Sequence, residues 1–188
     1  RIAPDNAGIY YNRGNSYFYL GDNLFKAIAD YTSAIKIDPE DWEGYYQRGI
    51  ANYNFLTQRN MFEAIADFTS AIRINPYFSH SFLARGMAYN KLGNYNEAIA
   101  DFTNAIRIDP DDGETYSNRG ISHTRSGNYN EAIADFTNAI RIDPNNSALY
   151  SLRGVLKRSI GLSYCSDYKI SCDFGEEKDC EVYYKECR

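Results

Sequence analysis

Several residue types and patterns that mark common functional classes are scarce in this 188-residue sequence. Lysine and arginine together number 20 against 25 aspartates and glutamates, so the net charge is −5. Binding nucleic acid by neutralising phosphates needs a basic face, and this charge balance disfavours one. The sequence also lacks an uninterrupted apolar run near the ~18 residues of a membrane-spanning helix. We therefore expect neither a nucleic-acid partner nor membrane insertion.

Patterns of catalytic and metal-binding residues are equally rare. Histidine occurs twice, as His80 and His123, and neither has a second ligand at a spacing typical of a metal site. The sequence holds no glycine-rich loop that cradles phosphate, no HExxH helix and no nucleophile elbow. We therefore expect a protein that is not an enzyme and that uses no cofactor and no metal.

What the sequence has in abundance is repetition. The stretch GNYNEAIADFTNAIRIDP occurs at 93–110 and again, unchanged, at 127–144. Related stretches begin at Ala27 and Ala64. An Arg-Gly pair precedes each copy, and its arginines are Arg13, Arg48, Arg85, Arg119 and, in a fifth unit, Arg153. A period of about 34 residues is typical of an array of stacked units rather than a globular fold.

Each unit has the pattern of two helices. In the third unit Phe82, Gly86 and Tyr89 are spaced by four and three residues, which places them on one helical stripe. Gly93 then ends that helix. A second stripe with the same spacings follows, formed by Ala98, Phe102 and Ala105. The small residues predict a close approach of the two helices, with the aromatic ring of the second helix filling the space between them.

This set of residues resembles the tetratricopeptide repeat. The family pattern is matched in the third unit by Phe82, Gly86, Tyr89, Gly93, Ala98, Phe102, Ala105 and Pro110, and in the fourth by Tyr116, Gly120, His123, Gly127, Ala132, Phe136, Ala139 and Pro144. The resemblance implies an all-α fold, a right-handed superhelical solenoid of antiparallel helix pairs. The units then span 7–40, 41–78, 79–112 and 113–146, followed by a divergent fifth unit at 147–175 and a capping helix at 176–188.

The first residues repeat the end of a unit. RIAPDN at 1–6 is similar to RIDPDD at 107–112. We interpret residues 1–6 as the end of an upstream repeat or extension, which predicts that the chain begins inside a longer one.

Charged residues recur in step with the repeat. Each unit has arginine before its first glycine, and four units carry aspartate at one place in the second helix. We predict ion pairs across each hairpin: Arg13 with Asp30, Arg48 with Asp67, Arg85 with Asp101, and Arg119 with Asp135. The alternative is a ladder of basic side chains that binds an acidic ligand.

All four cysteines lie near the end of the chain. Cys165 and Cys172 are seven residues apart, as are Cys180 and Cys187. Seven helical residues separate two sulfurs by roughly 10 Å, too far for one tetrahedral zinc site. If the two helices are antiparallel, Cys172 meets Cys180 and Cys165 meets Cys187, either as two disulfides or as four buried thiols.

The segment between the middle cysteines, SCDFGEEKDC, also resembles the bridged link of cysteine-rich Sel-type repeats. That resemblance favours the disulfides, although small apolar residues at a cap interface explain the pattern as well. Disulfides imply a compartment outside the reducing cytosol, whereas thiols imply the cytoplasm.

In the tetratricopeptide family the first helices line a concave groove that holds peptides or partner helices. Carried onto this chain, the groove positions are Tyr11, Asn15, Phe18, Tyr46, Ile50, Tyr53, His80, Leu83, Met87, Asn90, Lys91, Ser117, Ile121, Arg125 and Arg158. The alternative is that the aliphatic members Ile50, Met87 and Ile121, together with Val155, pack adjacent first helices.

The residues at these positions predict the ligand. Family members that clamp a terminal carboxylate use lysine and asparagine here. Only Asn15 matches, while Tyr11 and Tyr46 stand where lysine is expected. The positions are apolar early in the chain and mildly basic later, which favours an apolar segment or amphipathic helix with an acidic end.

Three functions therefore fit the sequence: a scaffold that binds a protein or peptide in the groove, a self-associating assembly module, and an accessory domain of a longer protein.

Overall fold

The computed structural model describes residues 6–21, 23–55 and 57–188, and these residues form eleven helices and no strands. Residues 1–5, which carry most of the predicted upstream segment, lie outside the described residues. The helices are α1 (Ala7–Tyr19), α2 (Leu24–Ile37), α3 (Trp42–Asn54), α4 (Gln58–Ile74), α5 (Ser79–Leu92), α6 (Tyr95–Ile108), α7 (Gly113–Arg125), α8 (Tyr129–Ile142), α9 (Ser147–Ser159), α10 (Cys165–Asp173) and α11 (Glu177–Glu186).

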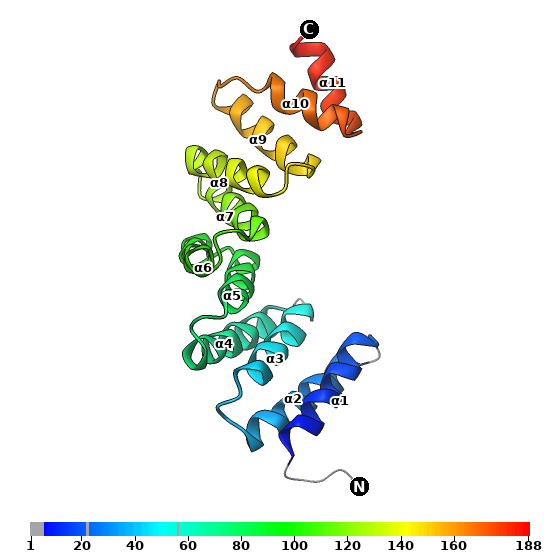
Figure 1. The fold of residues 1–188 in the computed structure, drawn as a ribbon, viewed down its shortest axis with the longest axis vertical. Coiled ribbons are helices and arrows are strands. Elements are labelled where there is room, and N and C mark those ends of the chain that lie inside the picture. Colours follow the sequence, from blue (N-terminus) through cyan, green and yellow to red (C-terminus); the bar gives the residue numbers. More distant parts are fainter. Residues whose placement is uncertain (1–5, 22, 56) are drawn as a thin grey trace. The chain divides into compact units, whose positions relative to one another are not determined.

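The chain divides into two compact units, one ending at Ile108 and the other beginning at Asp109. Unit 1 contains three helical hairpins in succession, α1 with α2, α3 with α4, and α5 with α6 (Figure 1). Within unit 2, α7 pairs with α8, α9 packs on both α8 and α10, and α10 packs on α11. Successive helix pairs are the architecture that the repeat pattern predicts.

Local sequence signals explain where the helices begin and end. Asn6, Asn23 and Thr57 each accept a hydrogen bond from a backbone N–H in the first turn of the helix that follows, which satisfies one of the donors left open at a helix start. Gly93 ends α5 with φ +82°, a left-handed conformation that glycine adopts without strain. The turns are therefore encoded locally in each repeat.

The core of each hairpin forms where a glycine of the first helix faces an aromatic ring of the second. Tyr31, Phe68, Phe102 and Phe136 are at most 1% exposed. A Cβ added at Gly86 would lie 2.6 Å from the ring of Phe102, so only glycine permits this approach. Buried alanines of the second helices complete these cores.

Candidate functional site

The arginine of every Arg-Gly pair binds an aspartate in the second helix of its own hairpin. Arg48 donates from Nε to Oδ2 of Asp67 at 3.0 Å and from Nη2 to Oδ1 at 2.7 Å. The same two-point contact joins Arg13 with Asp30, Arg85 with Asp101, Arg119 with Asp135, and Arg153 with Asp167. The five aspartates are only 1–5% exposed. The arginines are thus engaged inside the hairpins, and the fifth pair is one that the sequence analysis did not assign.

The hydrogen bonds of these pairs favour the charged form of Arg13 and of Arg48. A hydrogen bond with Asp30 is the main cause of the raised pKa of Arg13. Burial opposes the charge of Arg48, but its hydrogen bond and Coulomb attraction to Asp67 outweigh burial, and the pKa of Arg48 is raised as well. These guanidinium groups therefore stay protonated and connect the two helices of a hairpin.

Arginines of these pairs also reach the preceding repeat within their own unit. Arg48 donates from Nη1 to Oγ1 of Thr32 at 3.1 Å, and Arg85 makes the same bond to Thr69 at 2.9 Å. In unit 2, Arg153 bonds Thr137 at 3.0 Å. We call these contacts the arginine–threonine links. They tie α3, α5 and α9 to the second helix of the hairpin before each of them, and the sequence signal for them is the threonine that follows the core aromatic.

In unit 1 the candidate groove residues lie along three neighbouring first helices, because α3 contacts both α1 and α5. We call this the first-helix surface, meaning the candidate groove residues of α1, α3 and α5. Tyr11 and Phe18 pack against the core of the first hairpin and remain half-buried. Tyr46, Ile50 and Tyr53 do the same in the second hairpin, and Met87 in the third.

The α5 end of this surface combines a cation with an aromatic ring. Lys91 places Nζ 3.8 Å from the ring centroid of Tyr53, a close cation–π contact between two repeats. Within the described residues no carboxylate forms an ion pair with Lys91. A cavity of about 430 Å³ adjoins it, lined by Gln58, Met61, Lys91 and Leu92. The charge of Lys91 thus remains available to an anionic group.

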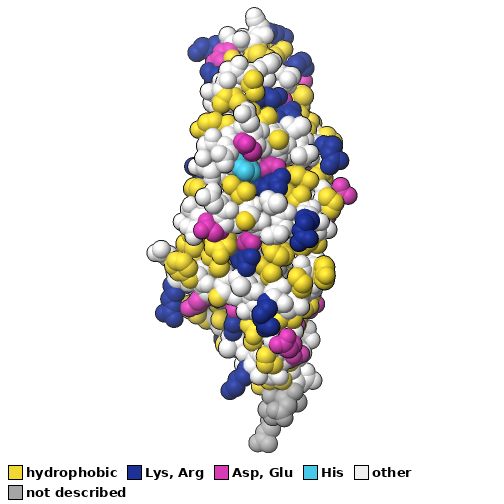
Figure 2. Space-filling view, turned by 90° about the vertical axis from the view of Figure 1, so that its left-hand side faces the viewer, with side chains coloured by type: hydrophobic (Ala, Val, Ile, Leu, Met, Phe, Trp, Pro, Cys, Tyr) yellow, Lys and Arg dark blue, Asp and Glu magenta, His cyan; other side chains and the backbone are white. Residues whose placement is uncertain are grey.

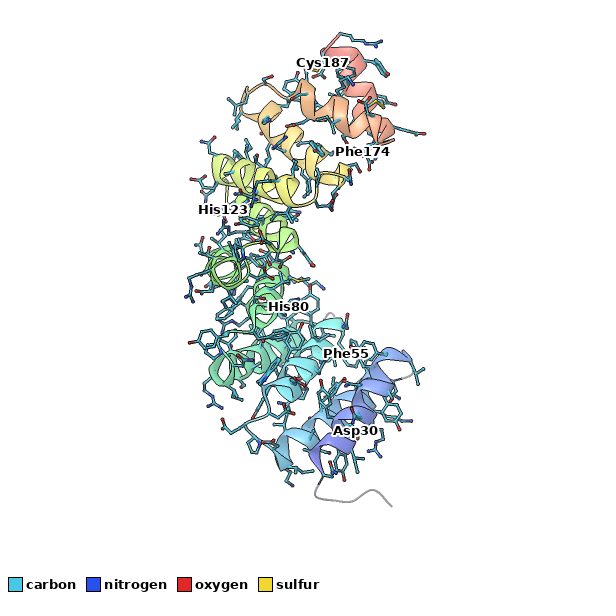
Figure 3. All side chains as sticks on the ribbon, viewed as in Figure 1. Asp30, Phe55, His80, His123, Phe174 and Cys187 are labelled. Carbon is cyan, nitrogen blue, oxygen red and sulfur yellow. A yellow bond between two sulfur atoms is a disulfide. The ribbon has the colours of Figure 1, made fainter. Side chains whose placement is uncertain are left out.

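Four aromatic side chains gather where α3 and α5 begin. The ring centroids of Trp42 and Tyr46 lie 4.5 and 5.1 Å from that of Phe78. The imidazole ring of His80 stacks on the ring of Phe78, with the two centroids 5.2 Å apart. Figure 3 marks His80 on α5. Trp42 and Phe78 were not among the predicted groove residues, although Trp42 is the one tryptophan in the sequence.

Polar side chains of α1 form hydrogen bonds with neighbouring helices. The amide oxygen of Asn15 accepts a hydrogen bond from the hydroxyl of Tyr31 at 2.8 Å. Burial is the main cause of the raised pKa of Tyr11, against hydrogen bonds with Asn15 and Gln47 that lower it. Tyr11 therefore stays neutral, and Asn15 is engaged within its own hairpin.

The remaining candidate residues differ in how much surface they present. Leu83 is 7% exposed and packs against Ala98 and Phe102, so it offers little surface to a ligand. Asn90 is half-buried. In unit 2, Ser117 is half-buried and lines a cavity of about 300 Å³, whereas Ile121 and Arg125 are exposed. Arg158 forms an ion pair with Glu186 of α11, whose attraction outweighs burial and raises the pKa of Arg158.

The cysteines form two disulfides between α10 and the end of the chain. Cys165 pairs with Cys187 and Cys172 with Cys180. Both pairs follow the register expected for antiparallel helices, and Figure 3 marks Cys187 at the end of α11. The alternative of four buried thiols is therefore not what the structure has.

Comparison with protein families identifies the repeats. A tetratricopeptide repeat model matches residues 7–41, a second matches 113–146, and a TPR repeat model matches 86–127. Together the three matches span more than half of the chain. The chain is a tetratricopeptide repeat protein.

Solved structures of other TPR proteins share the fold. A crystal structure of MamA superposes with a TM-score of 0.81 at 20% identity, covering 88% of this chain and 95% of MamA. YrrB, described as a TPR protein with an unusual peptide-binding site, gives 0.80 at 19% identity, covering 97% and 94%. The TPR domain of Arabidopsis OM64 gives 0.59 at 27% identity, covering 63% and 96%. A search of curated proteins found no match.

The surface of this TPR protein carries mixed charge. On the face drawn in Figure 2, the described lysines and arginines are scattered among acidic and apolar side chains and form no continuous basic patch. No group of three or more metal-ligating side chains occurs among the described residues. Within the same part of the chain, none of the helices has the length and apolar character needed to cross a membrane.

Proposed function

We propose that this TPR protein is an interaction scaffold that holds a peptide segment or a partner helix against the first-helix surface of unit 1. The observation that carries the proposal is the set of half-buried aromatic and apolar side chains along α1, α3 and α5: Tyr11, Phe18, Tyr46, Ile50, Tyr53 and Met87. Each packs one side against a hairpin core and keeps the other side accessible. Preformed aromatic anchors of this kind supply most of the binding energy in many interfaces.

The polar groups of the same surface define the ligand further. Lys91 sits over Tyr53 without a carboxylate partner among the described residues, so an acidic group at one end of the ligand would gain a charge-assisted contact. Asn15 already accepts a hydrogen bond from Tyr31, and tyrosines occupy the positions at which a carboxylate clamp needs lysine. The ligand that fits is an apolar segment with an acidic end, and capture of a chain terminus through a clamp is disfavoured.

The family supports this proposal in general terms. TPR proteins usually act as scaffolds for other proteins rather than as enzymes, and YrrB, with a similar fold, is described as having a peptide-binding site. The pattern of charges on this chain is its own, so the ligand is inferred from its own residues.

A selection experiment tests the proposal. Peptides selected from a displayed random library should contain an apolar stretch followed by an acidic residue. Tyr53→Ala should weaken the binding of a selected peptide, measured by fluorescence anisotropy, by about tenfold or more, because a central aromatic anchor is lost. Lys91→Gln should weaken only peptides that keep the acidic residue.

The matched control is Tyr77→Ala, because Tyr77 is 83% exposed and lies outside the first-helix surface. Circular dichroism of each variant establishes that it is folded. Equal affinities for Tyr53→Ala, Lys91→Gln and Tyr77→Ala would exclude the first-helix surface as the binding site.

Self-association is a second candidate function. Tyr19 and Leu20 near the end of α1 and Phe25 near the start of α2 are 71–74% exposed, which is a high exposure for large apolar side chains. A second copy of the chain could cover them. Sedimentation velocity over a hundredfold concentration range measures this directly, and a single monomeric species throughout would contradict self-association.

A further inference from the structure

One position beside the arginine–aspartate pairs holds four different residue types in the five repeats. It lies four residues after the arginine, on the same helical face, and is occupied by Tyr17, Asn52, Tyr89, His123 and Lys157. In the three repeats with shorter or charged side chains there, this residue approaches the second carboxylate oxygen of the aspartate. The side chain at this position therefore determines which group, besides the arginine, contacts the aspartate carboxylate.

The fifth repeat shows that an ammonium group fits at this position. Oδ2 of Asp167 accepts a hydrogen bond from Nε of Arg153 at 3.1 Å, and Nζ of Lys157 lies 2.9 Å from the same oxygen. The carboxylate is 1% exposed and carries both cations. The geometry of the hairpin thus accommodates a lysine ammonium next to the arginine.

In the second repeat this position holds the shorter side chain of Asn52. The amide nitrogen of Asn52 donates a long hydrogen bond of 3.5 Å to Oδ2 of Asp67, and its amide oxygen accepts a hydrogen bond from Asn60 at 3.0 Å. A cavity of about 310 Å³ opens there, bounded by Ile28 and Thr32 of α2 and by Glu63 and Ala66 of α4. We call it the α2–α4 pocket. Arg48, Asn52 and Asp67 also line the pocket.

The charges of the pocket favour a second cation. Burial raises the pKa of Asp67, although hydrogen bonds from Arg48 and Asn52 oppose the rise, so Arg48 alone does not fully offset the cost of burying the negative charge. Glu63 adds a carboxylate at the rim, where it pairs with the exposed Arg59. Ile28 and Ala66 provide an apolar wall along which an alkyl chain can lie.

We propose that the α2–α4 pocket binds a primary ammonium group carried on a short alkyl stem, with the ammonium at Oδ2 of Asp67 and the stem against Ile28 and Ala66. Lysine side chains of a partner and free alkylamines share this chemistry. The bound ammonium takes the place relative to Asp67 that Lys157 holds relative to Asp167. None of the residues lining the pocket belongs to the first-helix surface, so this site is separate from it.

Titration of ¹⁵N-labelled protein with n-butylammonium tests the proposal. Amide signals of residues around the pocket, including the side-chain amide of Asn52, should shift with saturation in the millimolar range, because the ligand has few heavy atoms. The uncharged analogue n-butanol should produce no saturating shift. A parallel titration with Nα-acetyl-lysine N-methylamide distinguishes the sources, because tighter binding of the blocked lysine indicates a protein ligand and binding of butylammonium alone indicates a small amine.

Asn52→Lys should abolish these shifts, because an internal ammonium then occupies the site as Lys157 does. Asn52→Tyr should also abolish them by filling the cavity, and serves if the first variant folds poorly. The matched control is Asn54→Lys, which adds the same charge on the same helix at an exposed residue. Absence of saturable shifts with either amine, equal shifts with butanol, or undiminished binding by both Asn52 variants would overturn the proposal.

Discussion

Gly86 and Gly154 occupy the same place in two repeats, but their surroundings differ. A Cβ at Gly86 would lie 2.6–2.9 Å from three ring atoms of Phe102, whereas a Cβ at Gly154 would find its nearest neighbour, Cβ of Asp167, at 3.3 Å. In the fifth repeat Tyr168 takes the place of the phenylalanine, and its ring lies further from the glycine. Packing therefore requires glycine at this repeat position strictly in the third hairpin and less strictly in the fifth.

This difference predicts different costs for the same substitution. Gly86→Ala should lower the free energy of unfolding by about 1–3 kcal/mol, because the methyl group forces the buried ring of Phe102 to move. Gly154→Ala should change it much less, because alanine gains up to about 1 kcal/mol in helix propensity and meets weaker crowding. Urea unfolding followed by circular dichroism measures both. Equal losses in the two variants would contradict the steric explanation.

At the scale of helices, one arginine side chain connects the two helices of its own hairpin and also reaches the hairpin before it. Arg85 binds Asp101 of α6 and also reaches back to Thr69 of α4. The link connects the third hairpin to the second without depending on apolar contact. Stability in such arrays is a sum of terms within repeats and terms between neighbours, and the arginine–threonine links contribute to the second kind.

The link predicts a coupled pair of substitutions. Thr69→Val keeps the shape of the side chain but removes the acceptor of Arg85, and should cost about 0.5–1.5 kcal/mol of unfolding free energy. Ser70→Ala is the control, because the Ser70 hydroxyl bonds only the backbone of Ala66 at 3.1 Å among the described contacts. In an Arg85→Lys background the cost of Thr69→Val should largely disappear. An unchanged cost of Thr69→Val in the Arg85→Lys background would show that the link does not contribute to stability.

At the scale of the molecule, the two units differ in what stabilises them. All four cysteines lie in unit 2, and the one tryptophan, Trp42, lies in unit 1. The last helix, α11, buries only Asp179, which accepts a hydrogen bond from Ser171 of α10. A helix with so little buried apolar surface depends on its covalent links to stay in place.

Reduction of the disulfides should therefore act mainly on unit 2. Hydrogen exchange at 176–188 should accelerate with a reducing agent, while the thermal transition followed by Trp42 fluorescence should shift less than the transition followed by circular dichroism. The two bridges span 22 and 8 residues, so a chain-entropy argument gives about 3 and about 2.5 kcal/mol for replacing each pair with serine. Unchanged exchange at 176–188 after reduction would show that noncovalent contacts suffice.

The elements of this TPR protein could be predicted because their signals are local. Spacings of three and four residues, a glycine with φ +82° at the end of α5, and prolines after second helices act within one repeat. The cysteine register also followed from helical spacing alone. The candidate site was predicted less well: Leu83 occupies a groove position in the repeat but is buried on Phe102, and Trp42 adjoins the surface from outside the repeat pattern.

What the sequence determined by itself is the repeated hairpin, because each hairpin is specified by residues close together in the chain. Only the tertiary structure decided the contacts between hairpins: Lys91 over Tyr53, Arg85 with Thr69, and the space left beside Asn52. These depend on which side chains of neighbouring helices meet, and those side chains differ from one repeat to the next. Repeat patterns average over such differences, whereas both proposed binding sites are built from them.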